Sequence, residues 1–311
     1  MARGGRRRYD EVDGLLLLNK PAGMTSNRAL QAVRRLLNAR KAGHTGSLDP
    51  SATGMLPLCF GEATKVSAFL LDADKTYRVT ARLGTATSTG DADGGETVAT
   101  APVPELSFDE WDRILQGFLG ESLQVLPMYS ALKKDGKRLY ELARKGEVVE
   151  REARPIRIDD ISLLEAAGTR LVFRVTCSKG TYVRVLVEDI AKAAGTVGHT
   201  ARLHRESVGP FRATEMVDLA AVEALAAKDR EALRAALLTP DVALQGMAAV
   251  EISAEDGAKF CGGQCVTGVP AENAGTVRVY AADKVFLGVG ELSGDGELAP
   301  RRVFKSSEKT P

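Results

Sequence analysis

The chain has 311 residues, of which 44% are hydrophobic and 27% are charged, as is usual for a soluble globular protein of about two domains. No apolar run approaches the roughly 18 residues that span a bilayer, which excludes a membrane protein and gives a cytoplasmic location as the expectation. The 42 basic and 41 acidic residues nearly cancel, but they are segregated along the chain. Segregated charge is typical of a protein with one face toward a polyanion, and equally of an ordinary solvated surface.

A basic arm begins the chain, and a buried strand and a helix are predicted after it. Residues 1–13, which include MARGGRRR, lack the apolar stretch of a signal peptide and are expected to be mobile. Residues 15–18 are all leucine and predict a buried strand that is closed at Lys20. Apolar positions recur with helical spacing in residues 27–41 and leave a basic polar face.

The loop GHTGSLDPSATG at residues 43–54 places a lone carboxylate, Asp49, among basic groups, because residues 14–48 contain no Asp or Glu. One interpretation is a helix cap, with Asp49 at the N-cap, Pro50 at the first helical position and Gly54 as the stop. The other is a nucleophile or base that neighbouring positive charge keeps ionised by lowering its pKa. The two roles are compatible, and the loop alone leaves both open.

Alternating and capped segments predict the other elements of the first part of the chain. Tyr77 shares a strand face with three apolar residues, and Ser107 with Glu110 forms a capping box for a helix that buries Trp111. The expected elements are a helix over 62–71, a strand over 77–83, an exposed loop over 84–100, a helix after Ser107, a strand over 171–177, a helix over 182–195 and helical segments to about Leu238.

The sequence changes in character near Thr239-Pro240, and a small β-rich module is predicted after it. Its short strands are expected at 248–252, 264–269, 276–280 and 284–292. The chain therefore divides into an arm (1–13), a first domain (14–245) and a second domain (246–311). The four cysteines and three histidines show no metal-ligand spacing, so neither a metal site nor a disulfide is predicted.

Six motifs occur in one order: LLLLNKPAGMTS, GHTGSLDPSATGMLP, KTYRV, PMYSALKKDGKRLYELARKG, CSKGTYVRVLVEDIA and LHRESVGPF. Over about residues 14–305 the chain resembles the bacterial tRNA pseudouridine synthase B family. Its C-terminal module is similar to the PUA-type RNA-binding domain of that family. The resemblance implies an α+β fold in which a mixed, largely antiparallel sheet has flanking helices and a basic cleft, followed by the small β-rich domain.

The resemblance also implies an activity. Members of this family convert the uridine at position 55 in the T-loop of tRNA to pseudouridine by flipping the base, breaking the glycosidic bond and rejoining the uracil through carbon, without a cofactor. The implied partner is tRNA, with no protein partner, guide RNA or membrane required, and a monomer is expected. Two alternatives stay open: an RNA-binding or RNA-folding protein whose isomerase site is idle, and a relative that modifies a different uridine.

By the same resemblance, Asp49 is the catalytic carboxylate and Arg184 is the arginine that pairs with it. Tyr77 matches the aromatic residue that stacks on the flipped base, and its hydroxyl is a candidate proton acceptor at carbon. Lys20 matches a support for the Asp49 loop. Alternation on a strand would equally explain Tyr77 as a core residue, and an exposed lysine at a strand end would be ordinary.

The remaining substrate-binding residues implied by the resemblance are Tyr182 and Leu203, which line the base pocket, and His44, which fills the space that the flipped base leaves in the T-loop. Simple packing would also explain Leu203, and a local hydrogen bond would explain His44. His204 and Glu206 depart from the family pattern, in which an Arg and a Thr are typical. This difference puts local RNA contacts, rather than the chemistry, in doubt.

Overall fold

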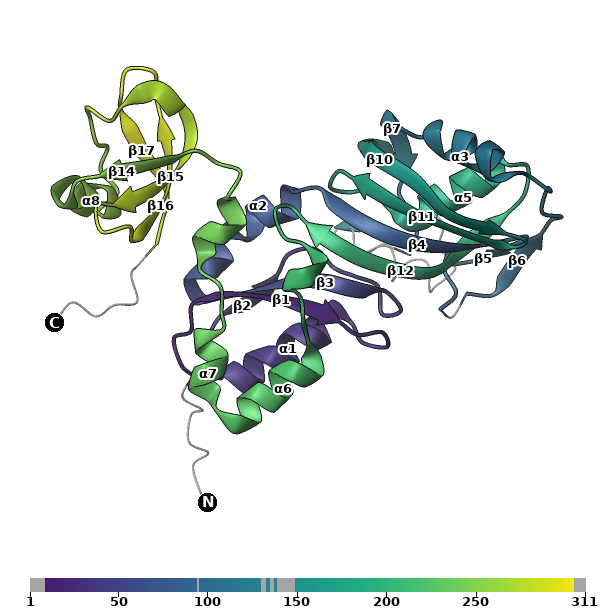
Figure 1. Cartoon of the computed structure of the whole chain (residues 1–311), viewed down its shortest axis with the longest axis horizontal. Coiled ribbons are helices and arrows are strands. Elements are labelled where there is room, and N and C mark those ends of the chain that lie inside the picture. The colour runs from purple at the N-terminus through teal and green to yellow at the C-terminus, as the bar shows by residue number, and fades with distance from the viewer. Residues whose placement is uncertain (1–8, 94, 130–132, 135–136, 139–148, 305–311) are drawn as a thin grey trace.

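The computed structural model describes residues 9–93, 95–129, 133–134, 137–138 and 149–304. Its larger body is built on one long twisted sheet, and a smaller four-stranded sheet from the C-terminal part of the chain stands beside it (Figure 1). In the described residues, neighbouring strands of the large sheet are antiparallel except at two parallel junctions. The α+β class and the mixed, largely antiparallel sheet predicted from the sequence are therefore confirmed.

The large sheet has the strand order β13, β1, β3, β12, β4, β11, β10, β7, with β2 paired to β3. Its strands are β1 (Gly14–Lys20), β2 (Ala42–His44), β3 (Thr53–Phe60), β4 (Lys75–Leu83), β7 (Gly120–Val125), β10 (Ala153–Ala167), β11 (Arg170–Cys177), β12 (Gly198–Val208) and β13 (Val217–Asp218). The parallel junctions are β1 with β13 and β3 with β12. The second junction sets residues 204–205 beside residues 53–54, directly after the Asp49 loop.

Helices cover both faces of one half of this sheet and one face of the other half (Figure 1). One face of β1 and β3 packs against α1 (Ser26–Leu37), α6 (Leu219–Lys228) and α7 (Arg230–Ala235). Their other face packs against η1 (Gly61–Val66), α2 (Ser67–Asp72) and η3 (Pro240–Leu244). The half formed by β4, β11 and β10 packs on one face against α3 (Phe108–Gln116) and α5 (Val183–Ala193).

The leucine run forms a strand because both of its faces are buried. Leu16 and Leu18 pack toward α1 and α6, whereas Leu15 and Leu17 pack toward η1 and η3. A strand covered on both faces has a continuous apolar sequence rather than an alternating one. The buried strand predicted from this run is confirmed.

β4 is covered on one face only, and its sequence alternates accordingly. Tyr77 and Val79 are buried on the covered face, while Arg78 and Arg82 are exposed on the other. The capping box that starts α3 is present, since the amide of Glu110 donates to Ser107 Oγ and the Glu110 carboxylate accepts from the Ser107 amide. Both predictions are confirmed.

The segment after α5 differs from the prediction. Helical segments are expected there, but residues 198–208 form β12 in the middle of the large sheet. Two irregularities in its pairing with β4, after Thr200 and after Arg205, break the alternation that would have marked a strand. The loop expected over 84–100 also differs, because it contains the two-stranded sheet of β5 (Thr85–Thr87) and β6 (Thr97–Thr100).

The C-terminal module is a four-stranded sheet with one helix. Its elements are β14 (Ala249–Ile252), α8 (Ala254–Cys261), β15 (Gly275–Ala281), β16 (Phe286–Leu292) and β17 (Leu298–Val303). The strand predicted over 264–269 is wrong, since Val266 makes only an isolated bridge to Leu298. β17 escaped prediction because Pro300 and two arginines interrupt its apolar pattern.

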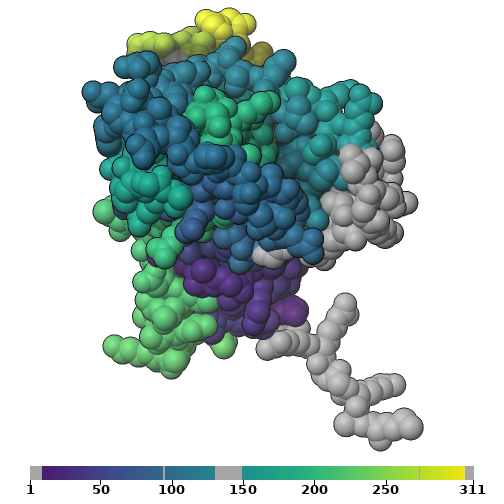
Figure 2. All heavy atoms as spheres, turned by 90° about the vertical axis from the view of Figure 1, so that its right-hand side faces the viewer, coloured from purple at the N-terminus to yellow at the C-terminus, as the bar shows by residue number. Residues whose placement is uncertain are grey.

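The packed chain begins before Gly14, inside the segment predicted to be mobile. The Asp10 amide donates to the Asn38 carbonyl, and Val12 is buried in the cluster below α1. Residues 1–8 lie outside the described residues. Figure 2 shows the end of the molecule that carries β5 and β6, with the N-terminal segments (purple) below and the C-terminal module (yellow) at the top. Within the described ranges, no helix is both long and apolar enough to cross a membrane.

Candidate active site

Lys20, at the end of β1, anchors the loop that carries Asp49. Its side chain is fully buried, and Nζ donates hydrogen bonds to the carbonyl oxygens of Pro21 (2.8 Å), Met24 (2.8 Å) and Pro50 (3.3 Å). These three bonds use all the donors of the ammonium group. Burial lowers the pKa of Lys20 to about 8, and the charge of Asp49 opposes that shift. Lys20 therefore fixes the backbone directly after Asp49 through the carbonyl group of Pro50.

Ser26 fixes the residue before Asp49. Its Oγ donates to the Leu48 carbonyl (3.0 Å) and accepts from the Leu48 amide (2.8 Å). The Asp49 carbonyl accepts a hydrogen bond from the Ala52 amide (3.1 Å), which makes a single turn, and residues 50–53 form no helix. Gly54 lies inside β3 rather than after a helix. The helix-cap interpretation of Asp49 is therefore wrong.

Arg184 holds Asp49 from the opposite side. It lies in the first turn of α5 with only 6% of its surface exposed, and its Nε is 3.1 Å from Asp49 Oδ2. Nη1 donates to the Thr89 carbonyl (2.7 Å) and lies 3.7 Å from Asp91 Oδ2, while Nη2 donates to the Tyr129 carbonyl (2.8 Å). The Asp49 side chain is 44% exposed, so the arginine orients a carboxylate that still faces solvent.

Burial raises the pKa of the Asp49 carboxyl group. Arg184 and Lys20 act in the opposite direction, while the nearby carboxylate of Asp91 adds to the rise. The sequence predicts a lowered pKa from the basic neighbours alone, and this direction is wrong. The loop packs Leu48 against the core below α5, so the cost of desolvating the carboxylate exceeds the attraction of the cations.

Tyr77 lies on the buried face of β4, and its cross-strand neighbour on β12 is Arg205. Arg205 is 1% exposed; its Nε donates to the Met55 carbonyl (2.7 Å) and its Nη2 donates to the Gly46 carbonyl (3.1 Å). The pKa of the Tyr77 phenol is raised overall, chiefly by burial, and the charge of Arg205 and a hydrogen bond from its side chain oppose part of that rise. An arginine thus stands beside each of the two predicted reactive groups.

Three other predicted residues border this region. His44 ends β2, and both burial and the charge of Arg205 lower its pKa, which favours the neutral imidazole. Tyr182 directly precedes α5, where its amide donates to Gln124 Oε1 (2.8 Å). Leu203, on β12, is partly buried against the core cluster between α5 and strands β4 and β11.

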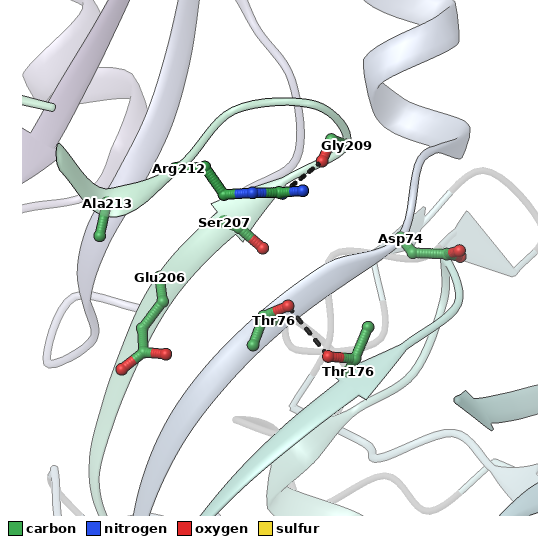
Figure 3. A pocket seen from close by; sticks show the side chains of 8 residues that line it. All are labelled: Asp74, Thr76, Thr176, Glu206, Ser207, Gly209, Arg212 and Ala213. Atoms are coloured by element: carbon green, nitrogen blue, oxygen red, sulfur yellow. Dashed lines mark hydrogen bonds between the residues drawn. The ribbon is translucent and has the colours of Figure 1, made fainter. Parts of the chain in front are cut away.

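The two residues that depart from the family pattern contact other side chains of the large sheet. His204 pairs across the strands with exposed Arg78, and its Nδ1 is 2.8 Å from Thr53 Oγ1. The Glu206 carboxylate accepts a hydrogen bond from Arg174 Nε (2.8 Å). Glu206 lines an open polar hollow of about 510 Å³ on the sheet face opposite Tyr77 (Figure 3). Its lining residues are Asp74, Thr76, Thr176, Glu206, Ser207, Gly209, Arg212 and Ala213.

Three family models match the chain: the TruB family pseudouridylate synthase N-terminal domain over residues 34–183, the tRNA pseudouridylate synthase B C-terminal domain over 184–245, and the pseudouridine synthase II TruB C-terminal domain over 248–304. The chain is 48% identical to tRNA pseudouridine synthase B of Nitrosococcus oceani over 306 residues, which are 98% of this chain and 99% of that protein. The chain belongs to the TruB family of pseudouridine synthases.

Another member of the family, tRNA pseudouridine synthase B of Aromatoleum aromaticum, is 52% identical over 296 residues, covering 95% of this chain and 94% of that protein. Among solved structures, the crystal structure of a Cbf5-Nop10-Gar1 complex matches with a TM-score of 0.74 at 25% identity, over 94% of this chain and 85% of that one. An archaeal box H/ACA sRNP Nop10-Cbf5 complex matches with a TM-score of 0.71 at 25% identity, over 96% and 88%. These matches confirm the family and its fold.

Two charged residues of the site were missed in the sequence. Asp91, the second carboxylate at Arg184, lies in a segment rich in Gly, Asp and Thr that predicted only a loop. Arg205 lies between the two residues that depart from the family pattern, in a strand whose pattern the irregularities obscure. The need of a buried Arg184 for carboxylate partners was the one signal that could have pointed to Asp91.

Proposed function

We propose that the chain isomerises the uridine at position 55 in the T-loop of tRNA to pseudouridine. The observation that carries the proposal is the ion pair of Asp49 with Arg184, in which a buried arginine orients a carboxylate that remains open to a substrate. The relatives named tRNA pseudouridine synthase B support tRNA as the substrate. The proposal thus joins a family assignment to a specific carboxylate.

The reaction begins when the uridine leaves its stack, at a cost of a few kcal/mol, and enters the site. The bond between N1 and C1′ breaks, and its electron pair leaves with the uracil. Asp49 stabilises the electron-deficient C1′ or traps it covalently. The uracil then turns, C5 bonds to C1′, the C5 proton is lost and N1 gains a proton. Substrate and product have the same atoms, so the reaction consumes no oxidant, reductant or group donor, and the proposal includes no cofactor.

The other predicted residues orient Asp49 or hold the base. Arg184 fixes the direction of the carboxylate by its 3.1 Å contact. Tyr77 stacks on the uracil, and its oxygen accepts the C5 proton, because it lies on the same core face as the Asp49 loop. Lys20 supports the Asp49 loop, and Tyr182 and Leu203 line the pocket for the base. His44 fills the space that the flipped base leaves in the T-loop.

The two bodies of the structure divide the work on tRNA. The first domain, residues 14–245, binds the T-arm and carries out the chemistry, and the C-terminal module, residues 246–311, extends the RNA-binding surface toward the acceptor stem. RNA of this kind is recognised by shape and by unstacked bases. In this proposal the chain acts as a monomer in the cytoplasm, without a protein partner or a guide RNA.

The test is tritium release from C5-labelled uridine in an unmodified tRNA transcript. Asp49→Asn keeps the shape of the side chain and removes its charge, so release should fall at least about a hundredfold while tRNA binding is retained. The matched control is Asp93→Asn, an exposed carboxylate of the neighbouring loop, which should release tritium at the wild-type rate. Undiminished release by Asp49→Asn, or binding without release by the wild-type protein, would contradict the proposal.

A further inference from the structure

Arg205 is the most completely buried charged side chain of β12, although Asp49 and Tyr77 suffice for the reaction as proposed. It is 1% exposed and has the largest volume among the fully buried side chains. A charged group in such a place is costly unless hydrogen bonds fix and satisfy it. Its surroundings therefore indicate what it does.

The guanidinium joins the two ends of the loop that carries Asp49. Nη2 donates to the carbonyl of Gly46, near the beginning of the loop, and Nε donates to the carbonyl of Met55, just after its end. The backbone of Arg205 also lies so close to Gly54 that a Cβ there would be 2.3 Å from the Arg205 carbonyl oxygen. The loop is thus held to β12 by both the side chain and the backbone of one residue.

The same side chain lies beside Tyr77. Arg205 and Tyr77 are directly paired across the antiparallel strands β12 and β4, so their side chains leave the sheet on the same face, about 5 Å apart at Cβ. Both residues are buried there, and Tyr77 is 9% exposed. A planar guanidinium fixed by two carbonyl groups presents its charge to the phenol oxygen in one orientation.

We infer that Arg205 is a positioning residue that acts through Tyr77: it stabilises the negative charge of the Tyr77 phenolate and thereby makes its oxygen the acceptor of the C5 proton. The inference rests on the proposed function and deepens it. In this step the C5–H bond breaks, its electron pair restores the double bond of the uracil ring, and the proton joins the phenolate oxygen to give a neutral phenol. N1 then takes a proton from solvent and the Tyr77 phenol returns its proton to solvent, so the phenolate is restored and the isomerisation needs no further reactant.

Several other ionisable groups face this region, and they set the controls. Asp49 and Cys177 raise the pKa of Tyr77, opposite to Arg205. Burial lowers the pKa of both Lys20 and Lys75 to about 8, and the charge of Arg205 contributes to both shifts. A change in the rate at alkaline pH could therefore arise from Tyr77, Lys20 or Lys75. The test must observe the phenol of Tyr77 directly.

The first measurement replaces Tyr77 by 3,5-difluorotyrosine, whose phenol is intrinsically more acidic, and follows its ionisation by fluorine NMR in the folded protein without RNA. Arg205→Met keeps most of the side-chain volume and removes the charge, so the pKa of the phenol should rise by at least about one pH unit. Arg205→Lys keeps the charge and should recover part of that shift. Arg174→Met, on the opposite sheet face, is the matched control and should leave the ionisation unchanged.

The second measurement is the single-turnover rate of tritium release at saturating enzyme, between pH 6 and 9.5, with natural Tyr77. Arg205→Met should lower the rate at pH 7.5 by about tenfold to a hundredfold and leave the dissociation constant for tRNA within about threefold. Arg205→Lys should regain most of the rate, and Arg174→Met should match the wild-type protein.

The outcomes separate the inference from the proposed function. An unchanged ionisation of residue 77 in Arg205→Met overturns the inference even if the rate falls, because Arg205 would then act only through the loop. Equal rates for Arg205→Met and Arg205→Lys overturn it as well. If the wild-type protein releases no tritium, the proposed function fails, and the NMR shift still decides whether Arg205 controls the charge of Tyr77.

Discussion

Burial and charge act against each other at Asp49, and their balance sets the pH range in which this carboxyl group is ionised. Desolvation raises its pKa and the Asp91 carboxylate adds to the rise, while Arg184 and Lys20 oppose it. Because the net shift is upward, the reactive ionised form is lost as pH falls through a value above the ordinary 3.8 of aspartate. Activity should therefore decline at a higher pH than the ordinary pKa of aspartate alone would give.

Asp91→Asn tests this balance. The substitution removes a carboxylate that raises the pKa of Asp49, so the acid limb of the single-turnover rate should move to lower pH. The maximal rate should also fall, because Arg184 loses the Asp91 carboxylate as a partner. Asp93→Asn serves as the control with an unchanged acid limb. A limb that stays in place, or that moves to higher pH, would show that Asp91 does not act on Asp49.

The sequence predicted part of this residue-scale picture. The partnership of Asp49 with Arg184 was available, because the resemblance names both and a helical arginine next to buried positions needs a carboxylate. The direction of the pKa shift of Asp49 could not be predicted, because the distribution of basic residues along the chain does not reveal how deeply the loop packs. Arg205 was hidden for a similar reason, since its contacts with Gly46 and Met55 exist only after β3 and β12 have met.

Element-scale predictions succeeded where one face of a strand or helix is buried and the pairing is regular. β4 and β11 alternate, the leucine run of β1 is apolar throughout, and α3 has its capping box. β12 was not predicted as a strand, although it lies in the middle of the large sheet. Two irregularities in its pairing each shift its alternating pattern by one residue. Those irregularities bring Arg205, rather than a neighbour, to the face of Tyr77.

The parallel junction of β3 with β12 makes a specific prediction at Gly54. This residue has a φ of 101° and no space for a Cβ, which would meet the backbone of Arg205 at 2.3 Å. Gly54→Ala should therefore push β3 away from β12 and cost about 2–4 kcal/mol of unfolding free energy, measured by urea denaturation. The rate of tritium release should fall with it, because the Asp49 loop and Arg205 move apart.

Gly43→Ala is the matched control for that measurement. Gly43 lies in β2, at the start of the same loop, and a Cβ there would have no heavy atom within 4 Å. Its unfolding free energy should stay within about 0.5 kcal/mol of the wild-type value. Equal stability of the two variants would mean that the close approach at Gly54 relaxes without cost.

On the scale of the whole molecule, the C-terminal module is docked on the first domain rather than merely tethered. Val289 and Phe304 of the module lie in one apolar cluster with residues of β1, β3 and η3. Two polar contacts cross the same boundary: Lys65 Nζ donates to the Val303 carbonyl (2.8 Å), and the Tyr280 hydroxyl donates to Asp241 Oδ2 (2.8 Å). Apolar burial combined with satisfied polar groups favours unfolding of both parts in one transition.

Phe304→Ala should separate the two parts. The ring is 5% exposed, lies 5.0 Å from that of Phe286 and has Lys65 Nζ 5.5 Å from its centroid, so truncation removes about 3–5 kcal/mol of packing. Scanning calorimetry should then show the module unfolding before the first domain, whereas the control Phe108→Ala, at a ring that is 51% exposed, should keep a single transition. Because Tyr77 and Leu48, the residue before Asp49, lie in a different core cluster from Phe304, the single-turnover rate at saturating tRNA should persist while tRNA binding weakens. A single transition at the temperature of the control would instead mean that the remaining contacts suffice for docking.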